Sequence, residues 1–144
     1  MAGIAKTVFD RFRFLVEIDG MKNTGFQKVK LPDIECDTIE YREGGANKPL
    51  KEPGQWKVGD AELSLGVTTN DEFIAWLDKV KSKGQSDKRN LSIIALDASG
   101  KEIGRWNIYG AFIKAVKYED LDATSNEKWI ETITLACDDI YRVK

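Results

Sequence analysis

Histidine is absent from the 144-residue sequence. Histidine is the most frequent general base in enzymes, a common zinc ligand and the side chain that titrates nearest to neutral pH. A catalytic base in this chain would therefore have to be a carboxylate or a lysine, acting beside an activated nucleophile. No such arrangement stands out, and we expect a protein that is not an enzyme.

Cysteine is almost absent, since only Cys36 and Cys137 occur, far apart in the sequence. Their spacing fits no zinc or CxxC motif, and the acidic residues Glu119, Asp120 and Asp122 lack the glycine-containing spacing of a calcium loop. We therefore expect no metal and no cofactor. A single disulfide is one alternative for the two cysteines. We expect free thiols, because the chain lacks the disulfide density of small secreted domains.

Long hydrophobic runs are also missing. No stretch reaches the roughly 18 apolar residues of a membrane-spanning helix, and residues 1–9 contain no apolar run of signal-peptide length. The 22 basic and 24 acidic residues give a formal net charge of −2, spread along the whole chain. We therefore expect synthesis in the cytoplasm, no membrane insertion of the subunit and no dedicated nucleic-acid binding.

Most of the chain shows the alternation that is typical of β-strands. In the first such segment Phe12, Phe14, Val16 and Ile18 all fall on one face. The same kind of pattern, bounded by turn residues, predicts further strands. The predicted strands cover residues 12–18, 25–31, 34–41, 56–68 (as one or two strands), 91–96, 103–109, 112–119 and 128–137. Residues 138–144 are expected to form a short tail.

One segment has a helical period instead. Thr69 and Glu72 have the spacing of a capping box, with Thr69 as the cap, and predict that a helix covers residues 70–83. Its apolar stripe consists of Phe73, Trp76, Leu77 and Val80. We expect this stripe to pack against the core rather than to form a ligand site.

The segment 42–54 contains two prolines, three glycines and several charges. Proline lacks a backbone donor and glycine raises the entropic cost of ordering, so we expect a long loop here rather than a strand. A loop of this length is either functional or the mobile end of a hairpin. Gly44 and Gly45 do not form a phosphate-binding loop, because the Gly-Lys-Ser/Thr ending is missing.

Strands at regular spacing around one helix predict a mainly β protein, an antiparallel β-barrel or sandwich with one amphipathic α-helix. Neither an internal repeat nor a domain boundary is visible. We therefore expect a single domain over residues 1–144.

Several short motifs, in order, resemble the tail-tube family of contractile phages, R-type bacteriocins and extracellular contractile injection systems. The motifs are Ile39-Glu40-Tyr41-Arg42-Glu43-Gly44-Gly45, Pro53-Gly54-Gln55, Leu65-Gly66-Val67, Phe73 to Leu77, Arg105-Trp106-Asn107-Ile108-Tyr109-Gly110-Ala111-Phe112, and Leu121-Asp122-Ala123-Thr124-Ser125-Asn126-Glu127. With the flanking strands the likeness covers residues 12–138. The sequence departs from the family pattern at Ile113, where proline is frequent, and over residues 56–62.

The resemblance implies a tail-tube domain that is related in fold to the tube protein of type VI secretion. It implies hexameric rings, joined by their inner sheets and stacked into a hollow tube, which a contracting sheath drives through a target envelope. The implied partners are further copies of the chain, the sheath protein, the baseplate and tail-terminator proteins, with cargo or DNA in transit through the lumen.

The long loop would then contact the neighbouring ring, through a set of residues that the family likeness and the composition single out together. This set is Arg42, Glu43, Gly44, Gly45, Lys48, Lys51, Glu52 and Pro53. Two alternatives are a type VI tube or cargo carrier and a monomeric β-barrel that binds a sugar or a lipid.

Overall fold

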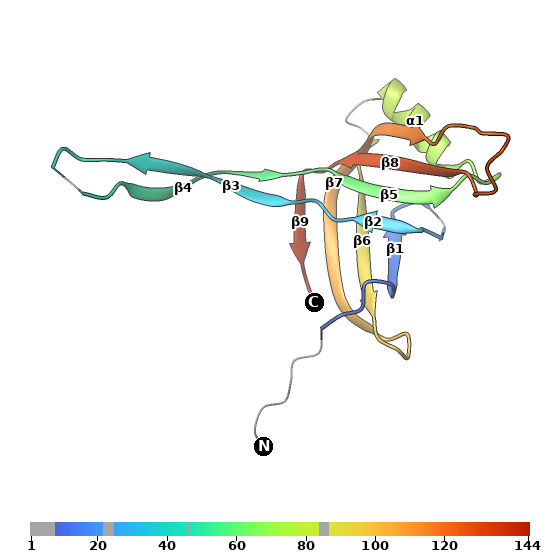
Figure 1. The fold of residues 1–144 in the computed structure, drawn as a ribbon, viewed down its shortest axis with the longest axis horizontal. Coiled ribbons are helices and arrows are strands. Elements are labelled where there is room, and N and C mark those ends of the chain that lie inside the picture. Colours follow the sequence, from blue (N-terminus) through green and yellow to red (C-terminus); the bar gives the residue numbers. More distant parts are fainter. Residues whose placement is uncertain (1–7, 22–24, 46, 84–86) are drawn as a thin grey trace, which may run out of the picture.

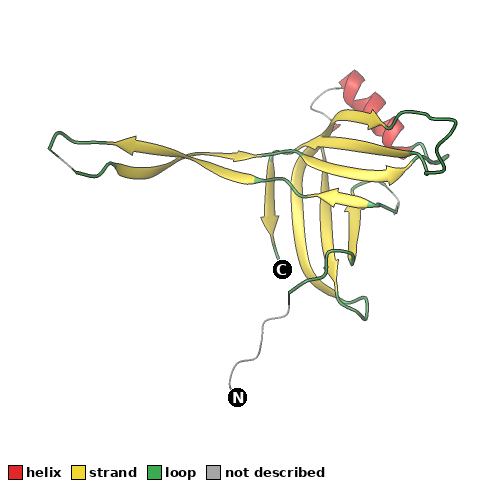
Figure 2. Ribbon diagram, viewed as in Figure 1, coloured by secondary structure: helices red, strands yellow, loops and turns green. Residues whose placement is uncertain are grey.

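The computed structural model describes residues 8–21, 25–45, 47–83 and 87–144. Within these residues the chain forms nine strands and one helix, so the expected mainly β fold with a single helix is confirmed (Figures 1 and 2). The strands are β1 (Phe14–Ile18), β2 (Lys28–Lys30), β3 (Ile34–Tyr41), β4 (Leu50–Val58), β5 (Ala61–Gly66), β6 (Arg89–Leu96), β7 (Glu102–Tyr118), β8 (Ile130–Ala136) and β9 (Asp139–Arg142). The helix α1 is Glu72–Lys83.

Two antiparallel sheets share the long strand β7. In sheet A, the order is β1, β6, the first part of β7 and β9; in sheet B, it is β2, β5, β8 and the second part of β7. We predicted two separate strands where β7 runs without a break. Gly110, with φ of +65°, allows β7 to pass from one sheet to the other, and a side chain there would overlap the Asp138 carboxylate.

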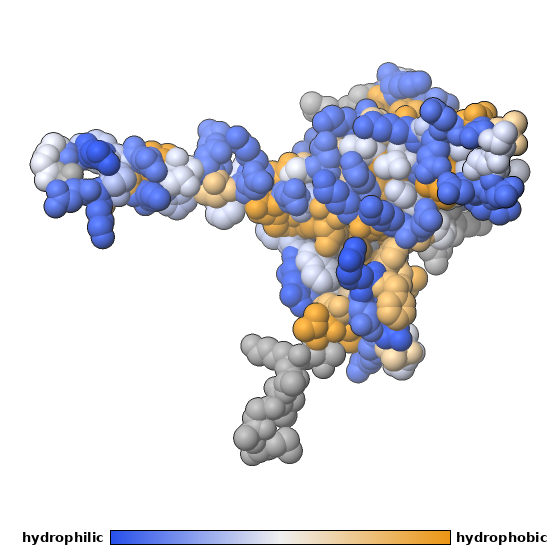
Figure 3. All heavy atoms as spheres, in the orientation of Figure 1, coloured by the Kyte–Doolittle hydropathy of each residue, from blue (hydrophilic) through white to orange (hydrophobic). Residues whose placement is uncertain are grey.

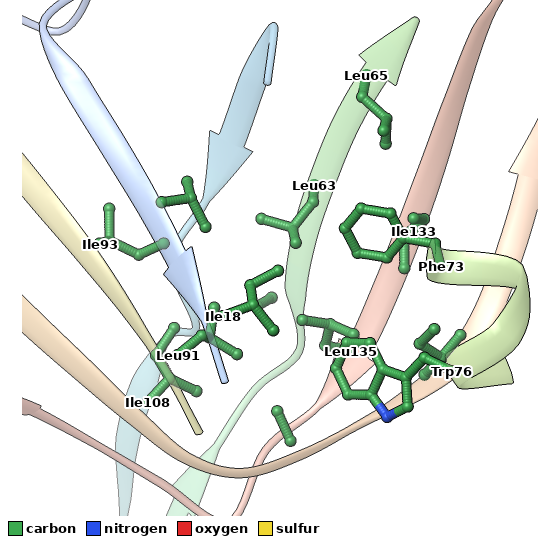
Figure 4. Close-up of a cluster of buried hydrophobic side chains, with 14 of the residues drawn as sticks. Ile18, Leu63, Leu65, Phe73, Trp76, Leu91, Ile93, Ile108, Ile133 and Leu135 are labelled. Carbon is green, nitrogen blue, oxygen red and sulfur yellow. The ribbon is translucent and has the colours of Figure 1, made fainter. Parts of the chain in front are cut away.

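The hydrophobic core lies between the two sheets, as Figure 4 shows. Strand β5 is a clear example of its origin, because its residues are alternately buried and half-buried as the side chains point to opposite faces. The buried Val, Leu and Ile side chains of this core are Val16, Ile18, Leu63, Leu65, Leu91, Ile93, Ile108, Ile113, Ile133, Leu135 and Ile140.

The helix adds its apolar stripe to this core. Trp76 is fully buried and Phe73 nearly so, and both point toward Ile133 and Leu135 (Figure 4), while Leu77 and Val80 are partly buried against the same core. The indole Nε1 of Trp76 donates a hydrogen bond to the backbone oxygen of Asp87 at 3.0 Å, which satisfies its one polar group.

The helix starts later than the capping box predicted. The backbone N–H of Glu72 donates to Asn70 Oδ1 at 3.0 Å, so Asn70 provides the capping contact that we assigned to Thr69. Both Thr69 and Asn70 have side chains that can cap a helix, and the sequence pattern does not determine which of them reaches the backbone N–H of Glu72.

Other predictions differ from the structure at the ends of elements or miss a short element. Phe12 lies outside β1 and is 71% exposed, and of residues 25–31 only Lys28–Lys30 form a strand. The expected tail contains β9, which pairs with β7. Short segments such as β2 and β9 become strands because a long neighbouring strand offers them backbone partners, which the local sequence does not reveal.

Candidate assembly surfaces

The most prominent surface feature is a β-hairpin that projects from the body (Figure 1). Strands β3 and β4 form a separate two-stranded sheet, which we call the arm. Nearly all of its residues are exposed. The predicted loop over residues 42–54 is therefore wrong in its second half, because residues 50–54 belong to β4. In a two-stranded ribbon both strands are edges, so Pro53 is tolerated.

The arm continues the hydrogen-bonding register of sheet B. Lys30 is opposite Glu62 in the β2–β5 pair, and after a short interruption Ile34 is opposite Val58 in the arm, in the same register. The N–H of Gly59 donates to the backbone oxygen of Asp33 at 2.8 Å and bridges the interruption. The arm is thus an extension of sheet B, and the sheet fixes the direction in which it leaves the body.

A β-bulge interrupts the arm halfway. Cys36 is opposite Trp56, but the next pair is Thr38 with Pro53, so β4 contains one extra residue at this point. A β-carbon at Gly54 would lie 2.8 Å from the backbone oxygen of Asp37, a distance that real side chains do not adopt. The motif Pro53-Gly54-Gln55 therefore corresponds to a bulge that requires glycine.

The residues that we predicted for ring contacts all lie on the arm and are all exposed. Arg42, Glu43, Gly44, Gly45 and Lys48 are in the connection at its end, and Lys51, Glu52 and Pro53 are on β4. The prediction missed the exposed apolar side chains of the same hairpin. These are Ile34, Ile39, Tyr41, Leu50 and Trp56, between 52% and 68% exposed.

The second candidate surface consists of the two edges of sheet A. Among the described residues, no strand pairs with the outer side of β1 or of β9. The backbone groups of Arg13 and Asp19 form hydrogen bonds with β6. Because successive residues of a strand direct their N–H and C=O groups to opposite sides, those of Phe14 and Val16 point to the open edge. Open edges of this kind bind further strands unless they are protected.

The face of sheet A that is turned away from the core carries polar side chains held by mutual contacts, together with the apolar side chains of Leu15 and Ile94. Ser92 Oγ donates to Asn107 Oδ1 at 2.8 Å, and Tyr141 donates its hydroxyl hydrogen to Asp139 Oδ2 at 2.6 Å. The Asp139 contact raises the pKa of Tyr141. The polar side chains of this face are therefore held in place by one another.

A charged group lies at one end of the same face. Arg105 contacts the Glu102 carboxylate at 2.7 Å and that of Glu17 at 3.7 Å. Its hydrogen bond to Glu102 lowers the pKa of that carboxyl. The guanidinium is thus shared between β1 and β7 and ties the two strands together across β6.

The Leu121–Glu127 motif forms a polar turn after β7. Asp122 Oδ1 accepts hydrogen bonds from the backbone N–H of Thr124 at 3.0 Å and from its hydroxyl at 2.8 Å, and these bonds lower the pKa of Asp122. The N–H of Glu127 then donates to Ser125 Oγ at 3.2 Å. The motif is accounted for as two successive side-chain turns.

A metal cluster and a membrane-spanning helix are both absent from the part of the chain that the structure describes. No cluster of three or more His, Cys, Asp or Glu residues there could hold a metal ion. No helix among the described residues has the length and apolar character that crossing a bilayer requires. Cys36 and Cys137 are both free.

Comparison with known proteins agrees with the geometry. Residues 10–141 match the family described as T4-like virus tail tube protein gp19. None of the curated proteins compared with the sequence matches it. A chain of the sheath-tube complex of an extracellular contractile injection system, PVC, in the extended state is 31% identical with a TM-score of 0.84, over 94% of this chain and 90% of that chain.

Two further solved structures are similar. A chain of the anti-feeding prophage cap, which terminates the tube, is 29% identical with a TM-score of 0.88, over 99% of this chain and 95% of that chain. Hcp1 from Flavobacterium johnsoniae is 14% identical with a TM-score of 0.56, over 92% of this chain and 95% of that chain, and this likeness shows the fold alone. The type VI alternative therefore fits less well. The chain belongs to the T4-like virus tail tube protein gp19 family and is a structural subunit of a tube.

Proposed function

We propose that six copies of this chain form a ring and that rings stack into a hollow tube, which a contracting sheath drives through a target envelope. The subunit acts mechanically and not as a catalyst, with all 144 residues serving as one domain. The observation that carries the proposal is the pair of open edges on sheet A, formed by β1 and β9.

Strand direction favours edge-to-edge joining. Each strand of sheet A is antiparallel to the next, so β1 and β9 run in opposite directions. Rotation about a ring axis then places β9 of one copy antiparallel to β1 of its neighbour. Every pair of adjacent strands around the ring is therefore antiparallel. A closed ring leaves neither edge exposed.

The polar face of sheet A is the one that suits the lumen wall. The core lies on its other face, and its own side chains are hydrogen-bonded to one another. A wall formed mostly by mutually bonded polar side chains limits the adhesion of cargo or DNA to exposed apolar groups.

The arm suits the contact between rings. It extends beyond the body that would form the ring, and its end carries charges of both signs that can set the register with a neighbour. In this proposal the arm binds further copies of the chain. The outer surface of the tube contacts the sheath protein, and the ends of the tube contact the baseplate and terminator proteins. The chain is made in the cytoplasm and functions in the assembled phage tail or contractile particle.

The ring is tested by covalent trapping. Glu17 on β1 and Tyr141 on β9 direct their backbone groups to their own sheet, so at a β1–β9 junction they would occupy non-hydrogen-bonded sites, where side chains come closest. Glu17→Cys/Tyr141→Cys and the shifted pair Leu15→Cys/Tyr141→Cys are made in a Cys36→Ser/Cys137→Ala background.

After mild oxidation, one of the two pairs should give a ladder of bands on a non-reducing gel that ends at six subunits. Each single-cysteine variant is the matched control and should give no band beyond a dimer. If both pairs remain monomeric or dimeric while the protein assembles, the edges of sheet A are not the ring contact.

Ring stacking is tested separately. Residues 36–56 are replaced by Asn-Gly, a two-residue turn that can close the hairpin at the hydrogen-bonded pair of Glu35 and Lys57 without changing the register before the bulge. The shortened protein should keep cooperative unfolding and ring formation but form no long tubes in electron micrographs. Normal tubes would refute the stacking role of the arm.

A further inference from the structure

The apolar side chains of the arm change ribbon faces along its length. Near the body, Ile34 and Cys36 pair with Val58 and Trp56, and paired residues share a face. Near the end, the apolar pair is Tyr41 with Leu50, and Ile39 lies on the same face as Tyr41, with Glu52 opposite it as the one charged side chain of that face. Along β3 the residues alternate, so Ile34 and Cys36 point to one face and Ile39 and Tyr41 to the other.

The bulge makes this change occur on both strands at the same point. Trp56 and Leu50 are separated by an even number of positions, and in a regular strand their side chains would share a face. The extra residue at Gly54 and Gln55 reverses the alternation of β4, so Leu50 joins Tyr41 on the second face. The arm thus has two apolar patches on opposite faces of its ribbon, divided by the bulge.

The twist of the arm brings the two patches back to one side. In Figure 1 strand β4 lies above β3 near the body and below it near the end, so the strands exchange places along the arm. Two-stranded ribbons twist strongly, and a bulge increases the twist. When the strands exchange places, a ribbon face that points one way near the body points the opposite way near the end. The bulge moves the apolar side chains to the other ribbon face at the point where the twist turns that face around. The apolar side chains near the body and near the end therefore lie on the same side of the arm.

The opposite side of the arm is charged along its whole length. Near the body it carries Glu35 and the ion pair of Asp37 with Lys57 at 3.2 Å. Near the end it carries Glu40 opposite Lys51. Figure 3 shows the arm as mainly hydrophilic in that view, with small hydrophobic areas among the charged side chains. The arm is therefore amphipathic in space although its sequence pattern changes halfway.

We propose that the apolar side of the arm, formed by Ile34, Trp56, Ile39, Tyr41 and Leu50, packs flat against a second copy of this chain, while the charged side faces solvent. The inference rests on the proposed function and specifies it further, because it states which side of the arm is buried in the assembly and which side is exposed to solvent. An isolated two-stranded ribbon is only marginally stable in water, and a matching surface would fix it in place.

A second copy is the occupant that the structure favours. A tube contains many copies of its subunit, and the arm continues sheet B, so its direction relative to its own body is the same in every copy. Identical arms held in one direction meet identical surfaces in a symmetric assembly.

The test compares neighbouring positions on the two sides. Single cysteines are introduced as Ile39→Cys and Glu40→Cys near the end and as Ile34→Cys and Glu35→Cys near the body, in the Cys36→Ser/Cys137→Ala background. Reaction rates with a maleimide are measured on dissociated subunits and on assembled tubes without sheath. Because a covered thiol is inaccessible, positions 39 and 34 should slow by about tenfold or more on assembly, and positions 40 and 35 by less than about threefold.

The possible failures are distinguishable. If the background protein forms neither rings nor tubes, the proposed function fails and this inference fails with it. If tubes form and both sides are protected equally, or neither is, one-sided packing alone is refuted. If positions 39 and 34 become protected only after sheath is added, the occupant is the sheath protein and not a second copy.

Discussion

The backbone oxygen of Asp37 would lie only 2.8 Å from a β-carbon at Gly54, across the bulge of the arm. This close approach makes a glycine necessary at one defined position of β4. Because the bulge sets which side of the arm Leu50 occupies, the contact between these two residues connects a local steric requirement to a whole assembly surface.

Gly54→Ala should therefore impair assembly without unfolding the body. The added methyl group displaces the bulge, but β3 and β4 pair only with each other, so the core should be unaffected. We expect the melting temperature to change by less than about 2 °C, while tubes become rare in micrographs. Gly25→Ala is the control, because a β-carbon there meets nothing within 4 Å and the residue lies outside the arm, and it should assemble normally. Intact tubes in Gly54→Ala would contradict the role of the bulge.

Trp76→Ala should strongly destabilise the subunit. The side chain is 0% exposed and also loses its hydrogen bond to Asp87, so we expect a loss of about 3–5 kcal/mol in the free energy of unfolding. Ile74→Ala, on the same helix at a position 51% exposed, should change it by less than about 0.5 kcal/mol. Urea denaturation measures both, and equal effects would show that the helix does not pack as described.

The two cysteines should behave as thiols of unequal reactivity. Burial raises the pKa of the Cys137 thiol to about 11, so little thiolate is present near pH 8. Alkylation of native protein should add one group quickly, at Cys36, and denaturation without reductant should expose the second. The Cys36→Ser variant should lose the rapid addition. A mass two protons lower with no alkylation after denaturation would demonstrate a disulfide.

Glu131→Gln should stabilise the subunit at neutral pH. Burial raises the pKa of Glu131 in the folded state, so the carboxyl favours folding while protonated and this contribution is lost as pH rises through the folded-state pKa. The variant should thus exceed the parent in melting temperature at about pH 7 and match it below about pH 4, the range of an ordinary glutamate. A difference that is independent of pH would argue against this cause.

Periodicity alone was enough to identify most of the elements. The alternation at Phe14, Val16 and Ile18 and the helical spacing of Phe73 and Trp76 reflect burial on one face, which is a local and repeating property. The loop prediction failed over residues 50–54 for a related reason. The composition of Pro53-Gly54 marks irregular backbone, and it does not distinguish a loop from a bulge inside a strand.

The sequence by itself thus determined the fold class, the helix and its buried face, and, through short motifs in a fixed order, the tail tube family. Only the tertiary structure decided that β7 is a single strand shared by two sheets, that β1 and β9 are open edges, and that the apolar side chains of the arm follow one side. These features depend on which strands pair, in which register and with what twist. Pairing joins residues that are distant in sequence, so no local pattern along the chain encodes it.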